Sequence, residues 1–124
     1  MAKRKPDPSD IDSYLPLPAS AMHIIVALAA GERHGYAIMR DITELSGGSV
    51  KMGPGTLYGS IKRMIDQGLV EEVDERPDPA LDDQRRRYYR LTALGERVGA
   101  AEQGRLAALL SAAQLRHLGL GGVS

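Results

Sequence analysis

The chain has 124 residues, 16 basic and 16 acidic side chains, a formal net charge of zero and 43% hydrophobic residues. This length suits one domain with a modest core, and the absence of cysteine excludes a disulfide framework, a thiolate nucleophile and a cysteine-ligated zinc site. No apolar run approaches the roughly 20 residues that cross a bilayer, so we expect a cytoplasmic protein without membrane association.

Residues 1–14 combine charged side chains with prolines and predict a flexible arm. The arm carries three consecutive basic residues, Lys3, Arg4 and Lys5. Such a run binds a polyanion in some proteins and is merely solvated in others, and both interpretations stay open here.

Two helices are predicted next. The first spans residues 15–31, with Pro18 in its first turn and Gly31 at its end. Its expected buried face holds Met22, Ile25, Val26 and Ala29. The second spans residues 36–48, and its apolar side chains recur at i, i+4 and i+7 as Ile38, Ile42 and Leu45. Residues 49–52 are too few for a helix and are expected to form a short strand.

The third predicted helix begins at Pro54 or Gly55 and ends near Gly68. Its apolar stripe consists of Leu57, Ile61, Met64 and Ile65. The opposite side is centred on Gly59, which lacks bulk, and is flanked by Thr56, Lys62, Arg63 and Asp66. A helix that enters the major groove of DNA needs little bulk at its closest approach and hydrogen-bond donors along its edges. An ordinary exposed helix face is the competing interpretation.

Residues 69–75 and 85–92 predict two strands of a hairpin around the loop 76–84. The second strand holds four arginines, Arg85, Arg86, Arg87 and Arg90, and alternate residues of a strand point to opposite faces. These arginines either contact phosphates or pair with acids of the facing strand, and both can hold for different arginines. Of the adjacent Tyr88 and Tyr89, one is expected in the core.

A long last helix is predicted from the N-cap Thr92 to Leu118, followed by a tail over residues 119–124. Its apolar face is longer than a small core can cover, so we expect it to form a homodimer through Leu106, Leu109, Leu110 and Ala113. Its glycines, Gly95, Gly99 and Gly104, either weaken the helix or allow close packing against the first helix.

The order of these elements predicts a mainly α (α+β) winged helix-turn-helix domain over residues 15–91, followed by a dimerisation helix over 92–118. Enzyme motifs are missing: the glycines of residues 53–59 fit neither the dinucleotide fingerprint nor a P-loop, and no second His or acid stands at ligand spacing from His34. We therefore expect no catalytic residues, no cofactor and no metal.

The sequence resembles the PadR family of bacterial transcriptional regulators, in its short form with one C-terminal helix. The resemblance rests on HGY at residues 34–36, GTLY at 55–58 and YYRLT-x-x-G at 88–95, in this order and spacing. It implies a dimeric repressor of a pseudo-palindromic operator, with DNA-facing residues Thr56, Tyr58, Ser60, Lys62 and Arg63 and a basic wing at Arg85–Arg87. We add Lys51 as a phosphate contact and Gly59 as the point of closest approach.

The resemblance further implies a small aromatic or drug-like effector that binds near the dimer interface and releases DNA. The chain has no tryptophan or phenylalanine, and its last predicted helix has no aromatic residue, which disfavours recognition by stacking. The alternative function is a winged-helix module that binds protein through its acidic hairpin without sequence-specific DNA binding. Salt dependence separates these two functions, because DNA affinity falls steeply as salt rises.

Overall fold

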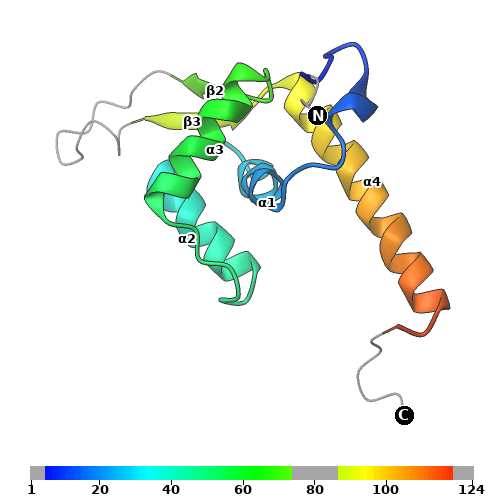
Figure 1. The fold of residues 1–124 in the computed structure, drawn as a ribbon. Helices are drawn as coiled ribbons and strands as arrows, with labels where there is room; N and C mark the ends of the chain where they lie inside the picture. The colour runs from blue at the N-terminus through cyan, green and yellow to red at the C-terminus, as the bar shows by residue number, and fades with distance from the viewer. Residues whose placement is uncertain (1–4, 74–86, 119–124) are drawn as a thin grey trace.

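The structure is a computed structural model that describes residues 5–73 and 87–118. Its elements are, in order, η1 (Ile11–Tyr14), α1 (Ala19–Leu28), β1 (Arg33–His34), α2 (Gly35–Leu45), α3 (Pro54–Asp66), β2 (Val70–Val73), β3 (Tyr88–Leu91) and α4 (Ala93–Leu115). α1 lies at the centre and packs against α2, α3 and α4 (Figure 1). The predicted mainly helical winged helix-turn-helix is confirmed.

The core forms where α1, α2 and α3 meet, around the fully buried Ile24, Ile38 and Leu57. The buried face of α1 differs from the predicted one, because Val26 is 45% exposed while Ala21, Ile24, Ile25 and Leu28 are buried. α1 is apolar on nearly all sides, so its periodicity alone does not identify the face that packs inward.

Within the described residues the sheet has three antiparallel strands, in the order β1-β3-β2. The strand expected at residues 49–52 is wrong: that segment has no strand pairing, and the Val50 N–H donates to the Ser46 hydroxyl at the end of α2. The third strand is instead β1, in which Arg33 pairs with Tyr89 and His34 with Tyr88. A two-residue strand has no detectable period and forms only because β3 offers it an open edge.

The predicted helix ends are close to the observed ones. Gly68 follows α3 with φ +78°, a left-handed conformation that glycine adopts without steric cost. Leu45 ends α2 but is 61% exposed, so its expected burial is wrong. Ile65, expected in the apolar stripe of α3, is also partly exposed. α4 ends at Leu115 rather than Leu118, closed by a hydrogen bond from the Leu118 N–H to the Ala113 carbonyl.

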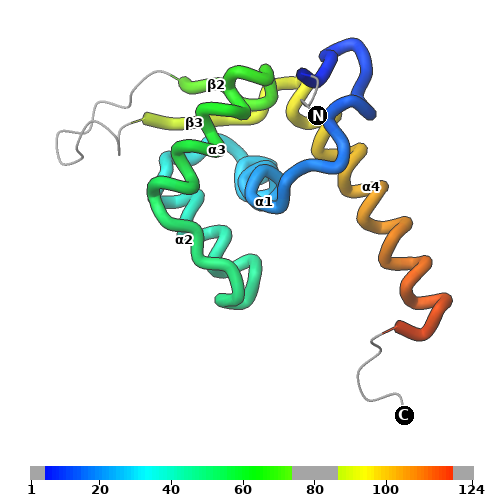
Figure 2. Tube along the Cα trace, viewed as in Figure 1, coloured from blue at the N-terminus to red at the C-terminus, as the bar shows by residue number. Residues whose placement is uncertain are grey.

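The N-terminal arm is folded over its described part. η1 packs against α4 (Figure 2). Tyr14 is buried, with its hydroxyl donating to the Gln67 carbonyl at 3.2 Å. The prediction of a flexible arm over residues 1–14 is therefore wrong for residues 11–14, because one aromatic side chain fixes this segment to the domain.

The first half of α4 is part of the domain core. Val98 and Gly99 are buried, and a Cβ atom at Gly99 would come within 2.7 Å of Ile25 Cγ2. A Cβ atom at Gly95 would collide with the backbone carbonyl of Leu69. Close packing against α1 is therefore the role of Gly99, whereas Gly104 has open space around it.

Candidate nucleic-acid interface

α3 has one buried and one exposed side. Leu57, Ile61 and Met64 face the core, while Thr56, Lys62 and Arg63 are exposed. The exposed side contains both cations of the helix, and its acid, Asp66, is the last residue of α3. The predicted division of this helix into an apolar stripe and a basic, glycine-centred face is therefore present in the structure, apart from Ile65.

The N-terminus of α3 is open. Its N-cap is Gly53, which supplies no side-chain cap, and a Cβ atom added at Gly53 or Gly55 would meet nothing within 4 Å. Lys51 lies two residues before the cap and is exposed. Uncapped N–H groups and the positive end of the helix dipole favour an anion at this position.

Ser60 is one of the residues that the resemblance places against DNA, but its side chain is buried. Its hydroxyl accepts a hydrogen bond from Arg63 Nη2 at 3.2 Å, while Arg63 Nη1 lies 3.8 Å from the position of a Cβ on Gly59. The Arg63 guanidinium therefore lies along the surface of α3, over Gly59 and Ser60. The Ser60 side chain therefore contacts the Arg63 guanidinium and is not itself on the exposed side of α3.

Tyr58 is partly buried and belongs as much to the core as to the exposed face. A Cβ atom at Gly35 would lie 2.7 Å from Cζ of the Tyr58 ring, so glycine at the start of α2 leaves the space that this ring occupies. The HGY and GTLY motifs therefore meet in the structure, and packing accounts for two of their residues.

Arg87, which directly precedes β3, and Arg90, within β3, pair with acids of β2. Arg87 Nε lies 3.4 Å from Glu72 Oε1, and Arg90 Nε lies 2.6 Å from Glu71 Oε1, and all four side chains are about half exposed. The competing interpretation, cross-strand pairing, therefore holds for both of these arginines. Arg85 and Arg86 lie outside the described residues.

The two tyrosines of β3 point to opposite faces, as predicted. Tyr89 is buried, and burial, with a smaller effect of Glu72, raises its pKa to about 12. Tyr88 packs edge-on against His34, with ring centroids 5.4 Å apart. His34 also caps α2 by accepting the Ala37 N–H at Nδ1, so this histidine has a structural role.

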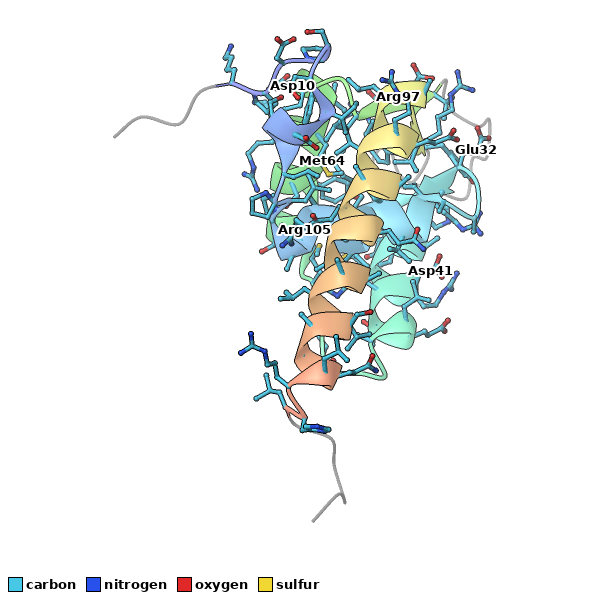
Figure 3. All side chains as sticks on the ribbon, turned by 90° about the vertical axis from the view of Figure 1, so that its right-hand side faces the viewer. Asp10, Glu32, Asp41, Met64, Arg97 and Arg105 are labelled. Atoms are coloured by element: carbon cyan, nitrogen blue, oxygen red, sulfur yellow. The ribbon has the colours of Figure 1, made fainter. Side chains whose placement is uncertain are left out.

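Glu102 is a buried acid that the sequence analysis did not identify. Its carboxylate accepts the Leu17 N–H at 3.1 Å and two hydrogen bonds from the Arg105 guanidinium, at 2.5 and 2.9 Å. Arg105 is labelled on α4 in Figure 3. The hydrogen bonds from Arg105, and more weakly that from Leu17, lower the pKa of Glu102, although burial opposes them. Glu102 therefore fixes the segment before α1 to α4.

We expect Glu102→Gln to lower the free energy of unfolding by about 1–2 kcal/mol at neutral pH, because a charge-assisted hydrogen bond is lost. A carboxyl whose pKa is lowered on folding stabilises above its unfolded pKa of about 4.3, and this contribution disappears as pH falls through the folded value. The difference between wild type and variant, measured by urea unfolding, should therefore shrink below about pH 4.3. Glu44→Gln, which changes an exposed acid, is the control and should show no such trend.

The second half of α4 is exposed. Leu106, Leu109 and Leu110 are exposed, and Ala113 is partly covered. A hollow of about 470 Å³ separates this half of α4 from α1, and its apolar lining includes Met22, Val26, Leu45 and Leu106. The four predicted dimerisation residues therefore share a surface that the single chain leaves largely open.

Within residues 5–73 and 87–118, no group of three or more His, Asp or Glu side chains could hold a metal ion. Among the helices in the described part of the chain, none is long and apolar enough to span a membrane.

A model of the transcriptional regulator PadR-like family matches residues 24–101. RosR of H. salinarum is 30% identical with a TM-score of 0.58, covering 79% of this chain and 78% of that one. Bacillus subtilis PadR, solved in complex with operator DNA, is 22% identical with a TM-score of 0.58, covering 73% of this chain and 48% of that one, and shares the fold. A 37.1 kDa protein in transposon TN4556 of Streptomyces fradiae is 42% identical over 55 residues, and these span only 15% of its length.

Proposed function

The chain belongs to the PadR-like family of transcriptional regulators, and from this premise we propose that it represses transcription by binding a pseudo-palindromic DNA operator as a homodimer. Members of this family are transcriptional regulators and not enzymes. The observation that carries the proposal is the exposed side of α3, which combines an uncapped N-terminus with Thr56, Lys62 and Arg63.

In the proposed complex, α3 enters the major groove with Gly59 at its closest approach. Thr56 and Arg63 contact base edges, since arginine matches the acceptors of guanine. Lys51, Lys62 and the first-turn N–H groups contact phosphates, which position the helix without specifying sequence. Bacillus subtilis PadR, which shares this fold, was solved in complex with operator DNA, and this supports DNA as the partner of this chain.

The proposed wing contributes through the arginines that precede β3 in the sequence. Arg87 is paired with Glu72, but both side chains are about half exposed, and an exposed ion pair of this kind is worth less than about 1 kcal/mol. We therefore expect Arg87 to exchange Glu72 for a phosphate at low cost. The same role is proposed for Arg85 and Arg86 from their sequence position alone.

The homodimer forms through Leu106, Leu109, Leu110 and Ala113 of α4. A pseudo-palindromic operator needs two copies of α3 in fixed relation, and a two-fold dimer supplies them. The hollow beside α1 is large enough for a small molecule, at about 470 Å³. An effector there would contact both α1 and α4 and would release DNA by changing the spacing of the two α3 helices.

The proposal is tested by selecting duplexes from a random-sequence library with the wild-type protein and titrating their binding across salt concentrations. Enrichment of an inverted repeat, with affinity that falls steeply as salt rises, supports it. Equal binding to selected and unselected duplexes contradicts sequence-specific regulation. No binding even at low salt favours the alternative, a protein-binding module that uses acids of the hairpin such as Glu71 and Glu72.

We expect Arg63→Ala to weaken binding to the selected duplex about 10-fold, because one base contact contributes about 1–3 kcal/mol. Ser60→Ala should have a smaller effect in the same direction, since it only releases the guanidinium from its hydroxyl partner. Arg97→Ala removes the same charge from α4 and is the control. Fluorescence anisotropy measures affinity and sedimentation checks the dimer. Equal affinities of Arg63→Ala and Arg97→Ala would remove Arg63 from the interface.

A further inference from the structure

The two flanks of α3 carry different neighbours. On one flank, Lys62 and Ile65 line a hollow with Arg87 and with Tyr89 of β3, so the wing lies on that side. On the other flank, Ser60 and Arg63 line hollows with Pro6 and Tyr14 of the N-terminal arm. The arm and the wing therefore lie on opposite sides of the proposed recognition helix.

The arm is fixed where it passes α3. Tyr14 donates from its hydroxyl to the Gln67 carbonyl just after the end of α3. The preceding residues form a compact turn, in which the Asp7 carboxylate accepts from the N–H and hydroxyl of Ser9, and Asp7 N–H donates to the Ser13 hydroxyl. The hydrogen bonds with Ser9 lower the pKa of Asp7. The chain is thus held on both sides of Pro8, and Lys5 stands close to this fixed turn.

Lys5 and Arg63 line the same surface hollow, of about 520 Å³, between the arm and α3. Asp66 is the one acid among its lining residues, and the remainder are Pro6, Pro8, Tyr14 and Gln67. The residues that line this hollow therefore include two cations and one acid. The hollow also adjoins the exposed side of α3, where Arg63 lies.

We propose that Lys5, held by the arm beside Arg63, binds a DNA backbone phosphate on the flank of α3 that faces away from the wing. This inference rests on the proposed function. A lysine ammonium is a compact charge that binds phosphate without a preferred base. The arm thereby acts as a second wing, and α3 is fixed in the groove from both sides.

The test compares wild type, Lys5→Ala, Lys5→Arg and Arg97→Ala in the full chain, on the selected duplex and on an unrelated duplex of the same length. Lys5→Ala should weaken binding to both duplexes by the same factor, about 5-fold, and reduce the slope of log affinity against log salt by about 0.9 per protomer. Lys5→Arg keeps the charge and should retain both values. Arg97→Ala, on α4, should change neither.

Three results overturn the proposal while leaving the regulator intact. The first is an unchanged salt slope in Lys5→Ala. The second is a loss of affinity confined to the selected duplex, which would indicate a base contact. The third is an equal loss of affinity in Arg97→Ala, which would indicate a general charge effect. Failure of the wild-type protein to bind any duplex is different, because it overturns the proposed function and this inference with it. Circular dichroism of each variant checks that the fold is retained.

Discussion

Replacing Leu109 and Leu110 together by aspartate is expected to convert the protein from a dimer to a monomer and to abolish selective DNA binding. The two side chains are 60% and 59% exposed in the single chain. If they are buried at a two-fold interface, each aspartate places an unpaired charge there at a cost of about 3 kcal/mol or more. Dimer affinity should then fall by at least about 100-fold, since 1.4 kcal/mol is tenfold.

The reason to expect a partner at this surface is the course of α4. At about 100° per residue, Leu106, Leu109 and Leu110 continue the stripe that Val98 and Glu102 begin, and those two residues are buried against the core. The core ends before the helix does, so the inward side of α4 continues into solvent (Figure 1). An apolar stripe of this kind is typical of an association site.

The matched control is Ala108→Asp with Ser111→Asp, which adds the same two charges on the opposite, exposed side of α4. Sedimentation velocity measures the oligomer, and anisotropy measures binding to the selected duplex. The control should remain dimeric and bind normally. A leucine variant that stays dimeric removes this face as the interface. A monomeric variant that still binds the inverted repeat with full affinity contradicts the need for two linked half-sites, which normally contribute about 10²-fold or more.

The sequence predicted the elements bounded by strong local signals. Pro54 and Gly68 bracket α3 and Thr92 caps α4, and each acts through backbone chemistry that depends little on the rest of the fold. β1 could not be found this way, because a two-residue strand exists only through its pairing with Tyr88 and Tyr89. The buried face of α1 could not be predicted either, since α1 is apolar on nearly every side.

Two polar residues are buried although their residue type alone does not predict burial. The resemblance implied that Ser60 faces DNA, yet it stands three residues after Leu57 and four before Met64, which places it beside the buried stripe. Glu102 likewise lies on the inward side of α4, four residues after Val98, and burial is tolerated because Arg105 and Leu17 satisfy its carboxylate. In both cases the position of the residue on its helix predicts that the side chain is buried, whereas its polarity does not.

The second large effect is expected from Gly53→Asp, which should stabilise the isolated protein slightly and weaken DNA binding about 100-fold. Gly53 has φ −79° and ψ 168°, an extended conformation that any N-cap residue adopts, and a Cβ there meets nothing within 4 Å. Aspartate should therefore cap α3 and add a few tenths of a kcal/mol to the free energy of unfolding. The same carboxylate accepts hydrogen bonds from the N–H groups that we propose bind a phosphate, and its charge repels that phosphate. Together these effects should reduce the free energy of DNA binding by about 3 kcal/mol.

Gly53→Asn separates the two contributions, because asparagine caps the helix with nearly the same shape and no charge. It should weaken DNA binding less than aspartate does, because it removes the phosphate hydrogen bonds without adding a repelling charge. The difference in DNA affinity between the two variants should diminish as salt rises. Thermal unfolding confirms the cap, and anisotropy on the selected duplex gives the affinities. If both variants are more stable and bind DNA as wild type does, no phosphate lies at the N-terminus of α3. The missing cap would then lower the stability of the protein without serving DNA binding. The contacts with DNA would in that case come from Thr56, Lys62 and Arg63.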